Sequence, residues 1–174
     1  MQKHIIVTIF LLISFFGNAQ IDTVSVKSIE GITNKMIELI SGAKDEPRNW
    51  DEYRSLFLPR AQKIFINRKA PPKKQIRVMN LEEFVRNVGP LYKRDGFEEI
   101  SLGLTINEYN GIANVFQSYY CKNLIGTYEK RGINSYQLIY ANDRWWIAST
   151  TFTNETEDNK IPNRYLSKEN QSKN

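Results

Sequence analysis

The hydrophobic residues of this chain change from a helical period to a strand period near residue 99, and this change restricts the fold more than any other feature. Before it, apolar residues recur every three or four positions over residues 26–40, as on one face of a helix. After it, they alternate with small or polar residues from Ile100 to Ile106, as in a half-buried strand. The sequence therefore predicts an α+β protein, with helices first and long strands second.

Three helices are predicted in the first half of the chain. The first covers residues 26–40. The second and third begin at Asn49 and Asn80, because each asparagine is followed three residues later by a glutamate, as in a capping box. We expect the third helix to break or kink at Gly89-Pro90, since a proline removes a backbone donor and crowds the preceding turn.

A short strand pair is predicted between the second and third helices. The second helix is expected to bury Phe57 and to end before Pro59, and the strands then cover residues 61–67 and 75–79. The segment from 68 to 77 holds five basic residues. We interpret it as a solvated turn, because no aromatic side chain is interleaved as in a platform for single-stranded nucleic acid. Nucleic acid is therefore not an expected partner.

Two hairpins are predicted in the second half of the chain. Asn110-Gly111 is the strongest short hairpin motif, and a strand from Ile112 to about Lys122 follows it. The second hairpin pairs residues 133–140 with residues 144–152 around Asn142-Asp143. Together with the strand before Asn110, these segments make four long antiparallel strands.

The late strands carry apolar residues on both faces, whereas a sheet with one face in water alternates apolar with polar residues. The helices can cover one face, and we expect a second copy of the chain to cover the other in a homodimer. By parity with Ile147 and Ile139, Trp145 is assigned to the helix-covered face. The outer face is then expected to hold Tyr136, Leu138, Tyr140 and Trp146.

The first residues resemble an export signal. Lys3 and His4 precede an apolar run, and the small residues Gly17 and Ala19 follow it. The run is shorter than the roughly 20 residues that cross a membrane, so no permanent membrane anchor is expected. We predict a signal peptide at 1–19, one domain at 20–156 and a polar tail at 157–174, in a protein that is periplasmic or secreted.

The charge and the cysteine content of the chain favour a soluble surface and exclude a disulfide within the chain. The net charge of +5 is modest and is typical of a soluble surface. Cys121 is the only cysteine, so no disulfide can form within the chain. We interpret it as a buried apolar residue, because it lies on a predicted strand with no histidine to activate it.

The predicted order of elements is similar to that of the nuclear transport factor 2-like superfamily. Residues 49–59 resemble its second helix leading into its first strand, and residues 111–119, 131–138 and 144–149 resemble the central strands of a SnoaL-like branch of small bacterial proteins. The resemblance implies a cone formed by a strongly bent sheet around helices. It implies no single reaction, because the superfamily includes isomerases, dehydratases, cyclases and transport factors.

The catalytic patterns that the resemblance implies are not matched. Ketosteroid isomerases use an aspartate base with tyrosine and aspartic acid donors, but residues 61–67 contain no carboxylate. Dehydratases of the superfamily rely on histidine, and the only histidine, His4, lies in the predicted signal peptide. No metal or cofactor is expected. The alternative that stays open is a lyase or isomerase that uses Asp51, Tyr53 or Tyr119.

The favoured interpretation is therefore a non-enzymatic binding domain for a small apolar or amphipathic ligand, with a purely structural interaction module as a further alternative. The polar residues expected around the pocket are Tyr53, Tyr119, Arg131, Asn134, Gln137, Trp145 and Ser149. Arg131 has a competing role as an ion-pair partner of Glu129 or Glu155. If the two sheet faces are exchanged, the polar residues to consider become Asn134, Ser118 and Thr150.

Overall fold

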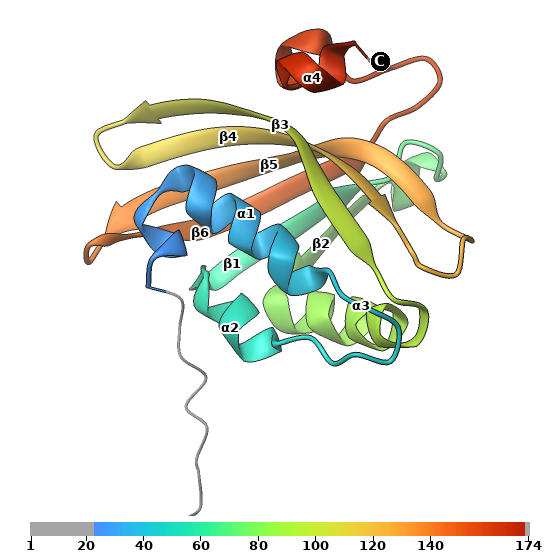
Figure 1. Ribbon diagram of the computed structural model, residues 1–174, viewed down its shortest axis with the longest axis horizontal. Coiled ribbons are helices and arrows are strands. Elements are labelled where there is room, and N and C mark those ends of the chain that lie inside the picture. The colour runs from blue at the N-terminus through green and yellow to red at the C-terminus, as the bar shows by residue number, and fades with distance from the viewer. Residues whose placement is uncertain (1–22, 173–174) are drawn as a thin grey trace, which may run out of the picture.

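A computed structural model describes residues 23–172 of the chain (Figure 1). The predicted signal peptide at 1–19 lies outside these residues. The α-helices are α1 (Ile29–Ile40), α2 (Trp50–Ser55), α3 (Leu81–Asp95) and α4 (Lys168–Gln171). The strands are β1 (Phe57–Ile66), β2 (Ile76–Asn80), β3 (Glu98–Tyr109), β4 (Ile112–Lys122), β5 (Glu129–Ala141) and β6 (Arg144–Asn154). Short 3-10 turns lie at Ser25–Lys27, Pro72–Lys74 and Asn163–Tyr165.

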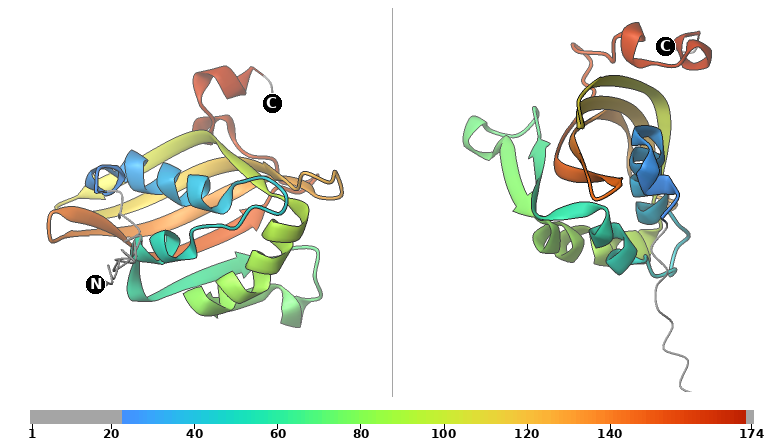
Figure 2. Two further views of the ribbon diagram at one scale, coloured as in Figure 1. Left: turned by 60° about the horizontal axis from the view of Figure 1, so that its bottom comes forward. Right: turned by 90° about the vertical axis from the view of Figure 1, so that its left-hand side faces the viewer.

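All six strands form one sheet in the order β2-β1-β6-β5-β4-β3. β1 runs parallel to β6, and every other neighbouring pair is antiparallel. The sheet curls strongly, with α1, α2 and α3 against its concave inner face (Figure 2). The predicted α+β class, with its bent sheet around helices, is confirmed.

Both predicted hairpin turns are present at the predicted residues. Asn110 and Gly111 have φ of 45° and 81°, and Asn142 and Asp143 have φ of 54° and 58°. Positive φ at both central residues matches the twist of paired strands, and asparagine, aspartate and glycine tolerate it best. Local sequence is therefore sufficient to place these turns.

The predicted starts of the second and third helices are also present, whereas the first helix begins at Ile29 after a 3-10 turn at Ser25–Lys27. The side chain of Asn49 accepts a hydrogen bond from the Glu52 amide, and Asn80 and Glu83 form a complete capping box. Of the break or kink predicted at Gly89-Pro90, the break is wrong, because α3 continues through Pro90 to Asp95. A proline removes only one donor. The turns on both sides of it are held by packing, through buried Phe84 before it and through Tyr92, which stacks on Phe97 after it.

β1 starts earlier than the sequence predicts. The second helix ends at Ser55, and Phe57 and Pro59 belong to β1 instead of preceding it. The pairing of β1 with β6 shifts register between Phe57 and Gln62, so Pro59 lies where the ladder is interrupted. A proline is tolerated there because no neighbouring strand needs its missing donor.

The predicted assignment of residues to the two sheet faces is wrong for part of β5 and β6. Tyr136 and Leu138 were expected outside but are fully buried inside, whereas Gln137 is exposed. β6 has a register shift beside Leu138, so Leu138 pairs with Ile147 while Gln137 pairs with Ser149. Before that shift, the two-residue turn pairs Ala141 with Arg144, so even-numbered residues of β5 share a face with odd-numbered residues of β6, and Leu138 lies inside with Ile147. Trp145 lies on the inner face, as predicted.

A second register shift divides β3. It falls between Ser101 and Gly103, opposite β4. Leu102 consequently packs on the outer face, whereas Leu104 and Ile106 pack against the main core inside. The regular alternation from Ile100 to Ile106 in the sequence therefore belongs to two faces of the sheet.

The C-terminal segment covers part of the outer face, at the end where Figure 1 shows α4 above β3 and β4. Leu166 and Ile161 are buried with Leu102 in a second apolar cluster. Ser118 Oγ donates a 2.6 Å hydrogen bond to the Tyr165 carbonyl, and the Ser167 amide donates one of 2.8 Å to the Leu102 carbonyl. Residues 161–167 belong to the predicted polar tail. They nevertheless pack on the domain.

Candidate functional site

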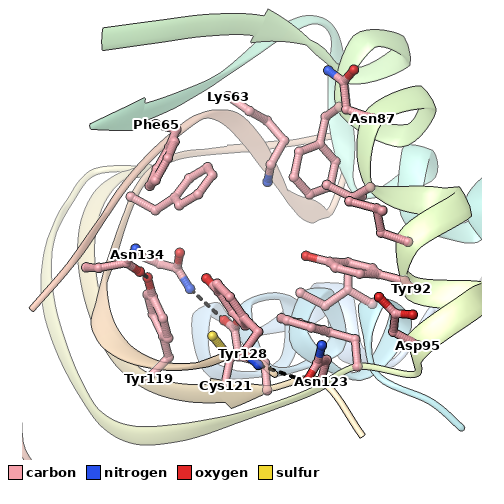
Figure 3. Close-up of a pocket in the computed structure, with 18 of the residues that line it drawn as sticks. Lys63, Phe65, Asn87, Tyr92, Asp95, Tyr119, Cys121, Asn123, Tyr128 and Asn134 are labelled. Atoms are coloured by element: carbon pink, nitrogen blue, oxygen red, sulfur yellow. Dashed lines mark hydrogen bonds between the residues drawn. The ribbon is translucent and has the colours of Figure 1, made fainter. Parts of the chain in front are cut away.

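A cavity of about 410 Å³ lies between α3 and the inner face of the sheet. Its volume is within the range of small-molecule sites. Figure 3 shows side chains from the strands and from α3 surrounding it. The apolar residues on its walls are Met36, Ile40, Phe65, Met79, Phe84, Val88, Leu91, Phe97 and Phe152.

Lys63 brings a buried amine into this cavity. It lies on β1 between Ala61 and Phe65, whose side chains face inward with it. Its side chain is 3% exposed, and its Nζ lies 4.5 Å from the ring centre of Phe84 and 5.2 Å from that of Phe57. Burial lowers the pKa of Lys63 to about 7, and the nearby Glu99 carboxylate opposes this shift.

Glu99 brings a buried carboxyl group into the same cavity. The start of β3 is held against the end of α1, because Ser41 Oγ accepts a 3.0 Å hydrogen bond from the Glu99 amide. Gly42 and Phe97 pair beside it. Burial raises the pKa of Glu99 to about 7, while the hydrogen bond from Asn134 and the charge of Lys63 act in the opposite direction.

Two further polar groups near this pair are buried without a hydrogen-bond partner among the residues that the structure describes. They are the hydroxyl groups of Tyr53 and Thr150. Thr150 pairs with Lys63 across the parallel β1–β6 ladder, and the Lys63 Nζ lies 5.6 Å from the centre of the Tyr53 ring. A buried hydroxyl without a partner costs free energy, so such groups are common where a ligand or water binds.

Other buried polar side chains in the core satisfy one another. Tyr136 donates a 2.9 Å hydrogen bond to Gln117 Oε1, and Gln117 Nε2 donates one of 3.1 Å to Asn34. Tyr119 donates a 2.9 Å hydrogen bond to Asn154 Oδ1. These bonds join β4 to α1, β5 and β6 within the core.

Cys121 lines the cavity but is not an activated thiol. It is buried, and burial raises its pKa to about 12. The thiol is therefore protonated at neutral pH, in keeping with the interpretation of Cys121 as an apolar residue.

The structure brings together only some of the residues predicted for the site. Tyr119 and Asn134 line the cavity, and Tyr53 is buried beside Lys63. Arg131 lies near Glu155, with Arg131 Nε 3.7 Å from its Oε2, as its competing role suggests. Trp145 is part of the core, T-shaped against Tyr140, and does not line the cavity.

The remaining predicted residues lie outside the cavity. Gln137 and Ser149 pair with each other on the outer face. Gln137 alternates with the buried Tyr136 and Leu138, and the bulge in β6 turns Ser149 outward. Of the alternative set, Thr150 is buried on the inner face, whereas Ser118 is bonded to the C-terminal segment outside. Asp51 is exposed and pairs with Arg54 at 3.0 Å, so it lies away from the cavity.

Lys63 and Glu99 are the functional candidates that sequence reasoning missed. In both cases a charged residue alternates with apolar residues that face the core, as in Ala61-Gln62-Lys63-Ile64-Phe65 and in Phe97-Glu98-Glu99. A charge at an apolar position of a strand is the pattern that would have identified them.

Within residues 23–172, no group of three or more histidine, cysteine, aspartate or glutamate side chains could hold a metal ion. No helix in the described part of the chain has the length and apolar character needed to span a membrane. The charged side chains that line the cavity are Lys63, Arg77, Arg94, Asp95 and Glu99.

No family model matches this sequence, and no curated protein matches it either. Several solved structures match this fold with similar TM-scores and similarly low sequence identity. A candidate scytalone dehydratase from Novosphingobium aromaticivorans has 10% sequence identity, a TM-score of 0.57, and coverage of 78% of this chain and 88% of that chain. A candidate dehydratase of the nuclear transport factor 2-like family from Streptomyces avermitilis has 10% identity, a TM-score of 0.57, and coverage of 75% and 96%.

A third solved structure is described by its fold alone. It is a protein of unknown function with a cystatin-like fold from Nostoc punctiforme, with 10% identity, a TM-score of 0.54, and coverage of 72% of this chain and 87% of that chain. At such low identity, these similarities concern architecture and not activity. Together with the curled six-stranded sheet and its helix-covered inner face, they show that this chain has the nuclear transport factor 2-like, or cystatin-like, fold.

Proposed function

We propose that this protein binds a small, mostly apolar molecule in the cavity between α3 and the sheet. The observation that carries the proposal is the cavity itself, about 410 Å³ in volume with mainly apolar walls. A domain that acts only as an interaction module has no need of such a space, because filling it with side chains would add stability.

The polar groups of the cavity suggest what the ligand carries at one end. Lys63 and Asn134 have N–H groups to donate, and Glu99 donates or accepts according to its protonation. A carbonyl or hydroxyl group on an otherwise apolar body would meet these side chains while its apolar part contacts the walls. The ligand class is therefore amphipathic.

Proton transfer on such a ligand is the second candidate function, of the lyase or isomerase type. Glu99 favours it, because burial raises the pKa of Glu99 to about 7, where a carboxyl group can both take and give a proton. Two proteins of the same fold are named as candidate dehydratases, which supports this reaction class. Glu99 takes the role of base in this proposal, in place of Asp51.

We also propose that the protein acts in the periplasm or outside the cell, and that it forms a homodimer through the outer face of its sheet. The first proposal rests on the sequence of residues 1–19 alone. The second rests on apolar side chains that remain exposed on β2, Ile76 and Val78.

Binding is tested with the fluorescent probe 1-anilinonaphthalene-8-sulfonate and with a cavity-blocking variant, Val88→Trp. Val88 lies on the cavity wall, so the larger side chain should weaken binding by at least about tenfold, or about 1.4 kcal/mol. The matched control is Ile125→Trp, in an exposed loop. Thermal melting establishes that both variants fold. Equal probe binding by the two variants would contradict the proposal.

The second candidate function needs a probe that reports a buried carboxylate base. The Kemp elimination of 5-nitrobenzisoxazole is such a reaction, because its rate depends on abstraction of one C–H proton. We expect elimination above the rate in buffer, lost in Glu99→Gln and retained in Glu98→Gln, whose carboxylate pairs with Lys122 at the surface. A wild-type rate no greater than that of Glu99→Gln would exclude Glu99 as a base.

A further inference from the structure

Lys63 is placed as a reactive amine and not as a partner of an ion pair. Within the described part of the chain, no carboxylate oxygen lies within 4.0 Å of its Nζ. Its surroundings are the faces of Phe84, Phe57 and Tyr53. Figure 3 shows the amine pointing into the cavity. A lysine in an apolar pocket is the arrangement that activates an amine as a nucleophile.

We propose that Lys63 forms a reversible imine with an aldehyde or ketone ligand in this cavity. This inference deepens the proposed function and rests on it, because it names the ligand class of the same cavity. The ligand has a carbonyl group at one end and an apolar body that contacts the walls formed by Phe65, Met79 and Val88.

The reaction balances without an oxidant or reductant. The lone pair of the Lys63 Nζ attacks the carbonyl carbon, a C–N bond forms as the C–O π bond breaks, and one proton passes from the nitrogen to the carbonyl oxygen to give a carbinolamine. The hydroxyl group then leaves as water, while the nitrogen loses its remaining proton and the C=N bond forms. This loss of water needs two proton transfers, one to the departing oxygen and one from the nitrogen.

Glu99 is suited to those proton transfers. It lines the same cavity, and the charges of Glu99 and Lys63 influence each other. Its protonated form gives a proton to the leaving hydroxyl group, and its carboxylate form takes one from the nitrogen. Asn134 holds the carboxyl group through a 2.8 Å hydrogen bond to Oε1, which leaves Oε2 for these transfers.

The lowered pKa of Lys63 also favours attack by its amine on a carbonyl group. Burial lowers the pKa of Lys63 to about 7. Compared with a lysine of ordinary pKa, roughly a thousand times more of the amine is uncharged at neutral pH. Only the uncharged amine attacks a carbonyl group, so Lys63 should react ahead of the exposed lysines.

The test uses the full chain at pH 7 with 6-methoxy-2-naphthaldehyde and sodium cyanoborohydride, which reduces an imine to a stable amine. Intact mass gives the number of adducts, and peptide mapping gives their positions. We expect one adduct at Lys63, formed at least about tenfold faster than at any other lysine. Lys63→Arg and Lys63→Met should lose this adduct, whereas Lys73→Met, in the exposed basic turn, should keep it. Glu99→Gln should slow labelling without moving it.

Two analogues separate failure of this inference from failure of the proposed function. 6-Methoxy-2-naphthalenemethanol has the same body but cannot form an imine, and 6-methoxy-2-naphthoic acid can only pair with Lys63 as an anion. If the alcohol binds and the aldehyde labels lysines without preference for Lys63, the imine is excluded and the binding site stands. Binding of the acid alone would make Lys63 an ionic anchor and overturn the imine. If none of the three binds, the proposed function fails as well.

Discussion

Asn134 Nδ2 donates a 2.8 Å hydrogen bond to Glu99 Oε1 across β4, which lies between the strands of the two residues. The bond is buried, and the two residues are 35 positions apart in the chain. It stabilises the charged form of Glu99 and so lowers its pKa, in opposition to burial. The carboxyl group is thus held in a fixed direction while its proton remains exchangeable near neutral pH.

The free energy of unfolding should have a minimum near pH 7 that depends on Glu99 and Lys63. Burial raises the pKa of Glu99 from 4.5 to about 7, so the folded protein keeps a proton that the unfolded chain loses, and stability falls across this window. Burial lowers the pKa of Lys63 from 10.5 to about 7, so the unfolded chain keeps the extra proton, and stability rises between these values. At about 1.4 kcal/mol per pKa unit, each limb amounts to a few kcal/mol.

Urea unfolding at about pH 5, 7 and 9.5 measures both limbs. Glu99→Gln should flatten the acid limb and Lys63→Met the alkaline limb, each relative to wild type. Glu98→Gln is the control, since its carboxylate pairs with Lys122 at the surface. Identical pH profiles for wild type and Glu99→Gln would show that Glu99 is not a buried acid.

Trp145→Ala should destabilise the domain much more than Trp146→Ala. Trp145 is 6% exposed in the main core, and truncation of a buried tryptophan costs about 3 to 5 kcal/mol. Trp146 is half-buried on the outer face, where Arg144 lies 3.8 Å from its ring centre. Thermal melting of the two variants side by side is the measurement. A larger loss for Trp146→Ala would reverse the assigned faces.

Leu166→Ala should destabilise the protein by about 2 kcal/mol or more, because Leu166 is buried against the outer face of the sheet. Gly103→Ala should have a similar effect for a steric reason. A Cβ at residue 103 would meet the Tyr165 carbonyl oxygen and the Ser167 nitrogen of the same segment. Leu124→Ala, at an exposed position, is the control and should change stability by about 0.5 kcal/mol or less. Equal effects of Leu166→Ala and Leu124→Ala would mean that the segment does not pack.

The homodimer is expected at about 50 µM by light scattering. A charge at Leu138 would not test this interface, since Leu138 is buried in the core. Val78 is 53% exposed on the side of β2 opposite the cavity, so Val78→Glu should dissociate the dimer. Ile125→Glu, in an exposed loop, should not. A monomeric wild type would remove the proposed interface.

Export should leave a product that begins at Gln20, because Gly17 and Ala19 are small enough for signal peptidase. The intact mass of the exported protein is the measurement, and Ala19→Arg should block the cleavage. An exported product that still contains residues 1–16 would disprove the predicted signal peptide.

Sequence alone determined the features that depend on neighbouring residues. The capping asparagines Asn49 and Asn80 start helices because their partners are three residues away. The turns at 110–111 and 142–143 form because those residue types tolerate positive φ. The order of helices before strands followed from the change of hydrophobic period, and the α+β class followed from that order.

Only the tertiary structure decided which residues meet in the cavity. Bulges in β3 and β6 reverse the direction of every later side chain in each strand, and in β3 the apolar alternation from Ile100 to Ile106 continues unbroken across the bulge. The site also needs Lys63 on β1, Glu99 on β3 and Asn134 on β5 to converge, although no local motif joins them. Their meeting depends on the curl of the whole sheet around its core, because strand pairing over long sequence separations is set by packing and not by adjacent residues.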